Sequence, residues 1–492
     1  MKHEYIISID IGTSSTKTAL IKANGEFVYS TAWKNKVYYP EKNMVEQNPD
    51  EIYHGLIITI KRLFEETDVK PKNICALIID GILHSITPIS SDNAMLANSI
   101  IWADSRGFNQ SELLRKELDN REIRKRTGCS INPLYFPSKI LWYKQNAEDL
   151  YRRTSKFISI KEYVLFNLTK EYIVDKSTAS GTGLFNIVEE NWDTSLLHHL
   201  GMTKKNLSEI VEPLHSMNLK KIYLPEDLTF LDGIPLIVGA SDGPLAHLGS
   251  AGLDESKLSL TIGSSAAMRK WLKNPEINPD EESWCYYLAE RNWVSGGVAH
   301  DAGLAIEWLG KKLFGQELKY KEISKEIGCT PIGANGIIFI PFLSGERAPH
   351  YKPWARGFIY GLSYNHEKAH IYRAFLEGLG YRLKKIYNML SRGRERTLVI
   401  NGGMTGSKPL LQILSDYMGK KFIIPSNQEA TTVGNLILAL MFLGEIGSLK
   451  EGNKFNIEKE SINPRTDLHR EYNKVFEKQE RLYKLLYQSN PL

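Results

Sequence analysis

The sequence has few cysteines and no long hydrophobic run. Its four cysteines lie far apart, and no two form a Cys-x-x-Cys pair: Cys75, Cys129, Cys285 and Cys329. We therefore expect neither a disulfide framework nor a zinc site, which suits a reducing, cytoplasmic setting. No apolar run approaches the roughly 20 residues that a transmembrane helix needs, and the N-terminus lacks the apolar core of a signal peptide. We expect no association with membranes.

The sequence also lacks a strong excess of charge of one sign. It holds 62 basic and 57 acidic residues among 492, a net charge of +5. Spread over this length, that charge does not favour nucleic acid or a membrane surface as a partner. Hydrophobic residues make up 42% of the chain, as in ordinary globular proteins. The chain is too long for one typical core, so we expect two large domains.

Two segments share a pattern of strand, small-residue turn and strand. One covers residues 5–21, and the other, roughly half a chain length later, covers 257–269. Such self-similarity indicates an internal duplication of one domain type. Strands and amphipathic helices alternate around both segments, with long helices expected at 366–390 and 467–486. We predict an α/β protein with domains at residues 1–246 and 247–492.

The turn of the first segment, from Asp10 to Lys17, has features of a phosphate site. Its order is Asp10-Ile-Gly-Thr13-Ser14-Ser15-Thr-Lys17. A tight turn of glycine and hydroxyl residues presents several backbone N–H groups at one point, which phosphate oxygens require. The carboxylate before the turn could hold Mg²⁺ through water, because Mg²⁺ keeps much of its hydration. The alternative is an ordinary hairpin with a solvent-facing Asp10.

Asp242 is the candidate catalytic base. It follows the apolar run 235–238 and stands in the sequence Gly-Ala-Ser-Asp-Gly. A substrate can closely approach a carboxylate that ends a buried strand among small residues, which suits a base for a hydroxyl nucleophile. The alternative is a turn residue that caps the following helix.

Two further glycine-rich turns lie in the second half. Gly263-Ser264 mirrors the first turn, and residues 402–407 lead from a strand into a helix. Glycines at such a junction allow a phosphate or a flat ligand to approach the helix N-terminus, although each could also be a plain turn. The candidate nucleotide-binding residues are thus Thr13, Ser14, Ser15, Lys17, Gly263, Ser264, Gly402, Gly403, Met404 and Ser407.

Taken together and in order, these motifs resemble the FGGY-type carbohydrate kinases of the actin-like ATPase superfamily over nearly the whole chain. The matching features are residues 10–17, Leu83-His84, Trp102-Ala-Asp104-Ser-Arg106, 139–142, 239–243, 261–265, 342–349, Arg356-Gly357, Gly361-Leu362, Arg373-Ala374, Glu377-Gly378 and Gly402-Gly403. The resemblance implies two actin-like, ribonuclease H-like domains with the active site in the cleft between them. It also implies that ATP and Mg²⁺ take part, and that the domains close on their ligands.

The resemblance implies a role for several residues. Asp242 matches the catalytic base, Asp10 the carboxylate that positions Mg²⁺-ATP, and Leu83 with His84 the loop that contacts the sugar. His84 alone could equally be a buried structural histidine. The candidate substrate-binding residues are Leu83, His84, Arg106, Asp242 and Gly243.

Three positions that depart from the family pattern bear on the sugar: Ile82, Phe136 and Gly243. Gly243 stands where xylulose-type members carry Asn and glycerol-type members Gln, and its small size leaves room for a longer acyclic chain. Residues 239–243, 102–106 and 161–163 resemble the gluconate-type members of the family. This resemblance implies D-gluconate as substrate, with D-xylulose as the alternative. Arg106 is the first candidate to bind the gluconate carboxylate and Lys161 the second. Alternatively, Arg106 is a structural ion-pair partner of Asp104.

Two hypotheses of other classes remain. An actin-like ATPase or chaperone would bind ATP through similar turns, but it would need a protein-binding surface or an appended domain, and none is evident. A catalytically dead sugar sensor is disfavoured because Asp10 and Asp242 are both present. The expected partners are a small sugar or sugar acid and ATP. A homodimer is compatible with the sequence, which does not determine the oligomeric state.

Overall fold

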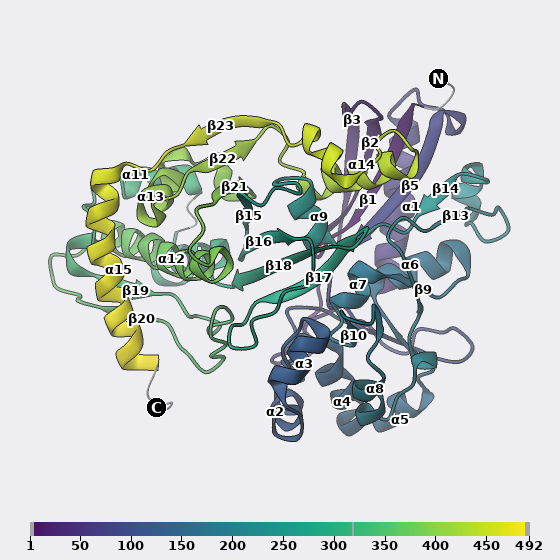
Figure 1. Ribbon diagram of the computed structural model, residues 1–492, viewed down its shortest axis with the longest axis horizontal. Coiled ribbons are helices and arrows are strands. Elements are labelled where there is room, and N and C mark those ends of the chain that lie inside the picture. The colour runs from purple at the N-terminus through teal and green to yellow at the C-terminus, as the bar shows by residue number, and fades with distance from the viewer. Residues whose placement is uncertain (1–3, 317–318, 488–492) are drawn as a thin grey trace.

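The computed structural model describes residues 4–316 and 319–487, and it contains two large β-sheets that lie side by side (Figure 1). The first sheet has the order β13-β14-β5-β1-β2-β3. Its strands are β1 (Tyr5–Ile11), β2 (Ser15–Lys22), β3 (Phe27–Lys34), β5 (Ile74–Gly81), β13 (Ser216–Asn218) and β14 (Pro235–Ile237). β1 pairs antiparallel with β2 and parallel with β5, and β14 pairs parallel with β5. The carboxyl ends of β1, β5 and β14 therefore meet at one edge.

Apolar strands and a capped helix form the core of this first sheet. Ile7, Ile9 and Ile11 of β1 are fully buried, and α1 (Pro49–Glu65) packs beside β2 and β3. Asn48 caps α1 by accepting a hydrogen bond from the N–H of Asp50, and Pro49 opens the helix. α6 (Ile160–Thr169) contacts β5. The core thus places the polar turns of the sheet at its rim.

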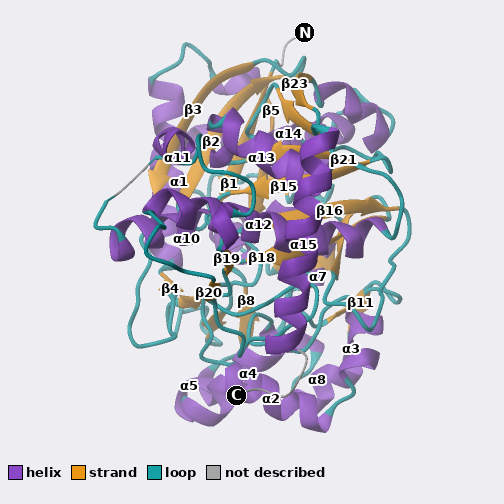
Figure 2. Cartoon of the chain, turned by 90° about the vertical axis from the view of Figure 1, so that its left-hand side faces the viewer, coloured by secondary structure: helices purple, strands orange, loops and turns teal. Residues whose placement is uncertain are grey.

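The second sheet has seven strands in the order β17-β18-β16-β15-β21-β22-β23. They are β15 (Lys257–Ile262), β16 (Ala266–Leu272), β17 (Trp284–Ala289), β18 (Asn292–Ala299), β21 (Thr397–Asn401), β22 (Phe422–Pro425) and β23 (Glu458–Ile462). Its helices are α10 (Gly303–Trp308), α11 (Tyr320–Glu326), α12 (Lys368–Ser391), α13 (Lys408–Met418) and α15 (Thr466–Tyr487). Figure 2 shows α15 running along the outside of this half. The hairpin of β15 and β16 repeats the arrangement of β1 and β2, as the sequence predicted.

Between residues 82 and 215 the chain forms a smaller lobe below the first sheet (Figure 1). Its helices are α2 (Phe108–Glu117), α3 (Asn120–Thr127), α4 (Phe136–Asn146), α5 (Glu148–Arg153), α7 (Lys176–Ser180) and α8 (Thr194–Leu200). The short paired strands of the molecule are β4 (Glu46–Gln47) with β7 (Ser99–Ile100), β6 (Thr87–Ile89) with β8 (Lys156–Ile158), β9 (Ile173–Asp175) with β12 (Glu209–Val211), β10 (Phe185–Asn186) with β11 (Asn191–Trp192), and β19 (Ile338–Ile340) with β20 (Phe358–Tyr360).

Two helices join the halves. α9 (Asp242–Leu248) leads from the first sheet toward the second, and α14 (Ala430–Phe442), from late in the chain, packs on α9 and on β1 and β5. Glycines allow the backbones of the α9 and α14 segments to approach closely. A Cβ on Gly249 would lie 1.9 Å from the carbonyl oxygen of Ala430, and a Cβ on Gly434 would lie 2.5 Å from the carbonyl oxygen of Leu245. A helix from late in the chain is therefore part of the first sheet's surroundings.

The structure confirms the predicted α/β class with two sheet-containing units. Among the described residues, no helix combines the length and the apolar character that crossing a membrane requires.

Candidate active site

Three carboxylates gather at the edge where β1, β5 and β14 end. Asp10 on β1 and Asp80 on β5 are register partners across the parallel pair. Asp242 follows β14 and opens α9, and the neighbouring Ser241 bridges to Gly81. In open α/β sheets, ligands bind at this carboxyl edge of the strands. The fold therefore brings Asp10 and Asp242 together, and it adds Asp80.

Mutual repulsion and burial perturb these carboxyl groups. Burial, together with the charge of Asp242, raises the pKa of Asp10 to about 6. Burial raises the pKa of Asp80 well above its ordinary value, and the charges of Asp10 and Asp242 raise it further. Clustered carboxylates of this kind favour a cation nearby. Sequence reasoning missed Asp80, although a carboxylate that ends the apolar run 74–79 was a usable signal.

The carboxyl group of Asp242, the predicted base, is perturbed as well. Burial raises its pKa, whereas Arg269 and the backbone of Gly243 and Leu83 act in the opposite direction. One carboxyl oxygen, Oδ1, accepts a 2.7 Å hydrogen bond from the N–H of Gly243. The residue at the helix cap is Ser241, not Asp242. The position is thus not that of an ordinary capping aspartate.

Side chains from three segments shape the first hairpin turn. Asn35 Nδ2 donates to the carbonyl oxygen of Gly12 at 2.8 Å, and Gln47 Nε2 donates to that of Thr13 at 2.8 Å. The indole N–H of Trp102 donates to Thr13 Oγ1 at 2.8 Å. Ser14, at the tip, is exposed. The turn is held by its carbonyl groups and by the Thr13 hydroxyl, which leaves Ser14 accessible to a ligand.

The second hairpin turn meets the glycine-rich segment of the second half. The N–H of Gly303 donates to the carbonyl oxygen of Gly263 at 2.9 Å, and a Cβ on Gly303 would lie 2.6 Å from Tyr320 Oη. Gly402 has φ +97°, and a Cβ there would lie 2.5 Å from the carbonyl oxygen of Ile262. Ser264 at the tip is exposed. The fold therefore brings the Gly263-Ser264 turn and the Gly402 turn together.

The predicted nucleotide-binding residues between 402 and 407 differ in burial and in hydrogen bonding. Met404 is fully buried in the core of the second half, so only its backbone can contact a nucleotide. The hydroxyl of Ser407 is buried and has no hydrogen-bond partner among the described residues. The same holds for both amide atoms of Asn401, which ends β21 just before Gly402. Asn401 was not predicted, although a polar residue between a buried strand and a Gly-Gly pair was a signal.

The Leu83-His84 loop lies beside Asp242. A Cβ on Gly243 would lie 3.9 Å from a methyl group of Leu83. His84 has φ +68°, and its Nδ1 lies 2.7 Å from the carbonyl oxygen of Gly181. Burial, with the charge of Arg347, lowers the pKa of His84 well below its ordinary value, so the imidazole is neutral. Tyr135 and Tyr286 pack edge-on against its ring.

In the structure, each of the two cations predicted to bind a carboxylate has an anionic partner within the protein. Arg106 pairs with Asp104 at 2.8 Å and Glu46 at 2.7 Å, so its guanidinium already has anionic partners. Lys161 is buried and pairs with Asp175 at 2.7 Å. Each charge is neutralised within the fold. This arrangement corresponds to the structural alternative for Arg106.

Arg269, which the sequence analysis did not select, lies at the site. It projects from β16 of the second sheet, and a Cβ on Gly243 would lie 3.6 Å from its Nε. Its Nη1 donates to Thr261 Oγ1 at 3.1 Å. No local pattern in the sequence predicted that Arg269 would lie at the site, because Gly243 and Arg269 come together only when the two halves of the chain pack.

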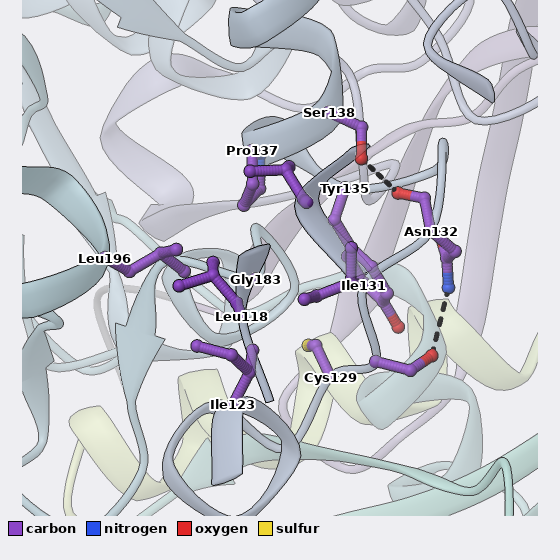
Figure 3. Close-up of a pocket in the computed structure, with 12 residues that line it drawn as sticks. Leu118, Ile123, Cys129, Ile131, Asn132, Tyr135, Pro137, Ser138, Gly183 and Leu196 are labelled. Atoms are coloured by element: carbon purple, nitrogen blue, oxygen red, sulfur yellow. Dashed lines mark hydrogen bonds between the residues drawn. The ribbon is translucent and has the colours of Figure 1, made fainter. Parts of the chain in front are cut away.

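A small pocket lies in the lower lobe, away from the carboxylates (Figure 3). It is lined mainly by apolar side chains, among them Leu118, Ile123 and Leu196. Its polar groups bond to one another, as Ser138 Oγ does to the carbonyl oxygen of Asn132 at 2.9 Å. None of the predicted site residues lines it, and we assign it no chemistry.

The site as a whole is that of a phosphotransferase with two sheet domains. Hairpin turns from both halves lie near a group of three carboxylates, of which Asp80 is fully buried and Asp10 and Asp242 are partly exposed. No metal cage accompanies them, since the described part of the chain contains no group of three or more His, Cys, Asp or Glu side chains that could hold a metal ion.

Comparison with known proteins identifies the family. Residues 5–249 match the N-terminal domain of the FGGY family of carbohydrate kinases, and residues 261–443 match its C-terminal domain. Gluconokinase from Bacillus subtilis is 31% identical over 459 residues, which cover 90% of this chain and 88% of the relative. The chain belongs to the FGGY family of carbohydrate kinases, and it is a sugar kinase that uses ATP.

Solved structures agree with this assignment. A gluconate kinase from Lactobacillus acidophilus superimposes with a TM-score of 0.91 at 27% identity, over 99% of this chain and 98% of that one. A xylulose kinase from the same organism has a TM-score of 0.91 at 28% identity, over 99% of both chains. The predicted two-domain, actin-like architecture is thereby confirmed. Since the family consists of sugar kinases, the chaperone alternative is not supported.

Proposed function

We propose that this enzyme phosphorylates D-gluconate to 6-phospho-D-gluconate, with Asp242 as the general base. The observation that carries the proposal is the position of Asp242, which lies partly buried beside the Leu83 loop and close enough to Asp10 and Asp80 for their charges to interact. The similarity to the Bacillus subtilis gluconokinase supports the choice of sugar.

In the proposed reaction the O6 hydroxyl of gluconate loses its proton to the Asp242 carboxylate as O6 bonds to the γ-phosphorus of ATP. The bond between the γ-phosphorus and the bridging oxygen breaks, and ADP leaves. The raised pKa of Asp242 makes its carboxylate a stronger base than an exposed aspartate. Leu83 and Gly243 shape the wall against which the sugar chain lies.

The phosphates of ATP would lie between the two hairpin turns, where the exposed Ser14 and Ser264 stand at the tips. Lys17, at the base of the first turn, would neutralise phosphate charge. The backbone of Gly402, Gly403 and Met404, with the unpartnered hydroxyl of Ser407, would hold the adenosine end. Binding in this way requires groups from both halves, which supports closure of the domains on the ligands.

The residues present also fit Mg²⁺. Asp10, Asp80 and Asp242 repel one another, as the raised pKa of Asp10 indicates, and a cation relieves that repulsion. Asp10 would hold the ion together with the ATP phosphates, since Mg²⁺ usually takes one or two protein carboxylates. The ion would neutralise charge on the transferred phosphoryl group.

The domain boundary, the cellular location, the oligomeric state and the alternative substrate stay predictions. We place the domain boundary between residues 246 and 247, inside the α9 segment, and we expect a cytoplasmic enzyme. A homodimer is tested by light scattering coupled to size-exclusion chromatography. Xylulose is the alternative substrate, because the xylulose kinase structure superimposes as well as the gluconate kinase structure.

A coupled assay that follows ADP release tests the proposal. The purified enzyme is assayed with gluconate, xylulose, ribulose, glycerol and fuculose. We expect the highest kcat/KM with gluconate. If xylulose exceeds it by about tenfold, which is about 1.4 kcal/mol in transition-state binding, the gluconate assignment is wrong and the kinase assignment stands.

A further inference from the structure

Arg269 is a partly buried cation that forms no ion pair with any carboxylate among the described residues. Its Nε–H is buried and donates to no acceptor among the described residues, and its Nη1 donates to the neutral hydroxyl of Thr261. By contrast, Arg106 pairs with two carboxylates and Arg382 pairs with Asp301. A buried charge that lacks a counter-charge is costly. Its presence at the site therefore points to an anion that arrives with a ligand.

Asp242 does not satisfy this requirement. The two side chains are close enough for Arg269 to act on the charge of Asp242, yet no ion pair between them is found within the described residues. A tight pair would also weaken Asp242 as a base. The guanidinium thus stands near the reacting group and keeps donors available.

The position of Arg269 along β16 separates it from the phosphate turn. Its backbone lies four residues past Ser265, about 13 Å along an extended strand, and its guanidinium reaches back to Thr261, the register partner of Ala267. Ala267 and Arg269 share one face of β16, because side chains alternate along a strand and both are partly exposed while Met268 is buried. The small Ala267 side chain leaves space between the turn and the guanidinium. The guanidinium therefore lies back along the hairpin from its tip, on the side of Gly243 and Leu83, where the sugar chain is proposed to lie.

Gly243 makes room for the guanidinium. A Cβ at position 243 would already be in van der Waals contact with Arg269 Nε, at 3.6 Å. A side chain longer than alanine at position 243 would overlap the space that the Arg269 guanidinium occupies. Residues 243 and 269, which come from different halves of the chain, therefore share one space. Glycine at 243 is what allows a cation from the second domain to reach the substrate.

We propose that Arg269 binds the carboxylate of a sugar-acid substrate and so selects an aldonate over a neutral sugar. This inference rests on the proposed function, which it extends by naming the residue that reads the acid group. A guanidinium can offer two parallel N–H donors to a carboxylate, a match that a neutral hydroxymethyl group cannot reproduce.

The test compares Arg269→Met, Arg269→Lys and Arg106→Met with the wild-type enzyme. Each is assayed with D-gluconate and D-xylulose, and binding of D-gluconate and D-glucitol, which differ only at C1, is measured by calorimetry. We expect Arg269→Met to lower kcat/KM for gluconate by about a hundredfold or more, with less than about a fivefold change for xylulose and an unchanged KM for ATP. Arg269→Lys should recover part of the loss.

Arg106→Met is the matched control, because it removes another buried guanidinium whose partners are internal. It should lower the melting temperature without changing the preference for gluconate over xylulose. The double variant Arg269→Leu with Gly243→Asn keeps the shared space filled, and it should bind glucitol at least as well as gluconate. Melting temperatures identify any variant that fails to fold.

Several outcomes would overturn the proposal. Equal losses on gluconate and xylulose, or a raised KM for ATP, would make Arg269 a phosphate-binding or structural residue. Selectivity lost in Arg347→Met but kept in Arg269→Met would assign the carboxylate to Arg347, which lies by His300. Wild-type data alone test the proposed function. An enzyme that prefers another aldonate, such as D-galactonate, would refute gluconate while leaving the role of Arg269 open to the same comparison.

Discussion

Lys17 and Glu429 form an ion pair of 2.8 Å between Nζ and Oε2, although 412 positions separate them in the sequence. Lys17 belongs to β2, just after the first hairpin turn, and Glu429 precedes α14. Burial alone would lower the pKa of Lys17, but Glu429, Asp10 and Asp80 outweigh it and raise that pKa. Lys17 is therefore a fully charged group that Glu429 and a nucleotide phosphate would share.

We expect opposite effects from removing the two partners. Lys17→Met should raise the KM for ATP about tenfold, because a phosphate loses its cation. Glu429→Gln should lower it a few fold, because Lys17 is released and a negative charge is removed; added salt should weaken the effect. Both side chains are 40% or more exposed, so stability should change by less than about 1 kcal/mol. A rise in KM for Glu429→Gln would show that the pair orders the turn instead.

Asp242→Asn should lower kcat by about a hundredfold or more, the usual loss for a general base. The amide keeps the shape of the side chain and its contact with the N–H of Gly243 but cannot accept the substrate proton. The KM for ATP should change by less than about threefold. Steady-state kinetics on the folded variant decide the matter, and near-normal turnover would remove Asp242 from the reaction.

Asp10→Ala should raise the concentration of Mg²⁺ required for half-maximal activity and reduce kcat by about tenfold or more. Asp10 lies among the clustered carboxylates rather than beside the Leu83 loop, so the KM for gluconate should stay within about twofold. Activity is measured against free Mg²⁺ at constant ATP. Lost affinity for gluconate with an unchanged Mg²⁺ dependence would reverse the assignment.

The raised pKa of Asp10 predicts a dependence of stability on pH. Its pKa is about 6 in the folded protein against an ordinary value of 3.8. Between these values the folded state holds a proton that the unfolded state has lost, so this group's contribution to stability falls as the pH rises toward 6. Asp10→Asn should therefore melt about 1–3 °C higher than wild type above pH 6, with no difference near pH 4.

That comparison is made on nucleotide-free protein by thermal unfolding across the pH range. Asp467→Asn serves as the control, because Asp467 is 93% exposed and lies on the outer helix α15. A constant difference between Asp10→Asn and wild type at every pH would mean that neither burial nor the neighbouring carboxylates raise the pKa of Asp10 in the folded protein.

Local patterns in the sequence predicted most of the fold. The strand-turn-strand segments formed as β1 with β2 and β15 with β16, and the helices expected at 366–390 and 467–486 are α12 and α15. Each of these elements depends on periodicity and on turn residues within a short stretch. The family assignment also followed from motifs in their order, since each motif is local.

The sequence by itself determined the two hairpin turns and the carboxylates Asp10 and Asp242, because glycine, hydroxyl residues and an apolar run mark such positions within a few residues. Only the tertiary structure decided which of the arginines near the site form ion pairs with carboxylates of the protein. Arg106 is bound by Asp104 and Glu46, while Arg269 has no anionic partner within the described chain and lies against Gly243. Ion pairs and shared volumes form between segments that are distant in sequence, so their outcome depends on packing that no local pattern encodes.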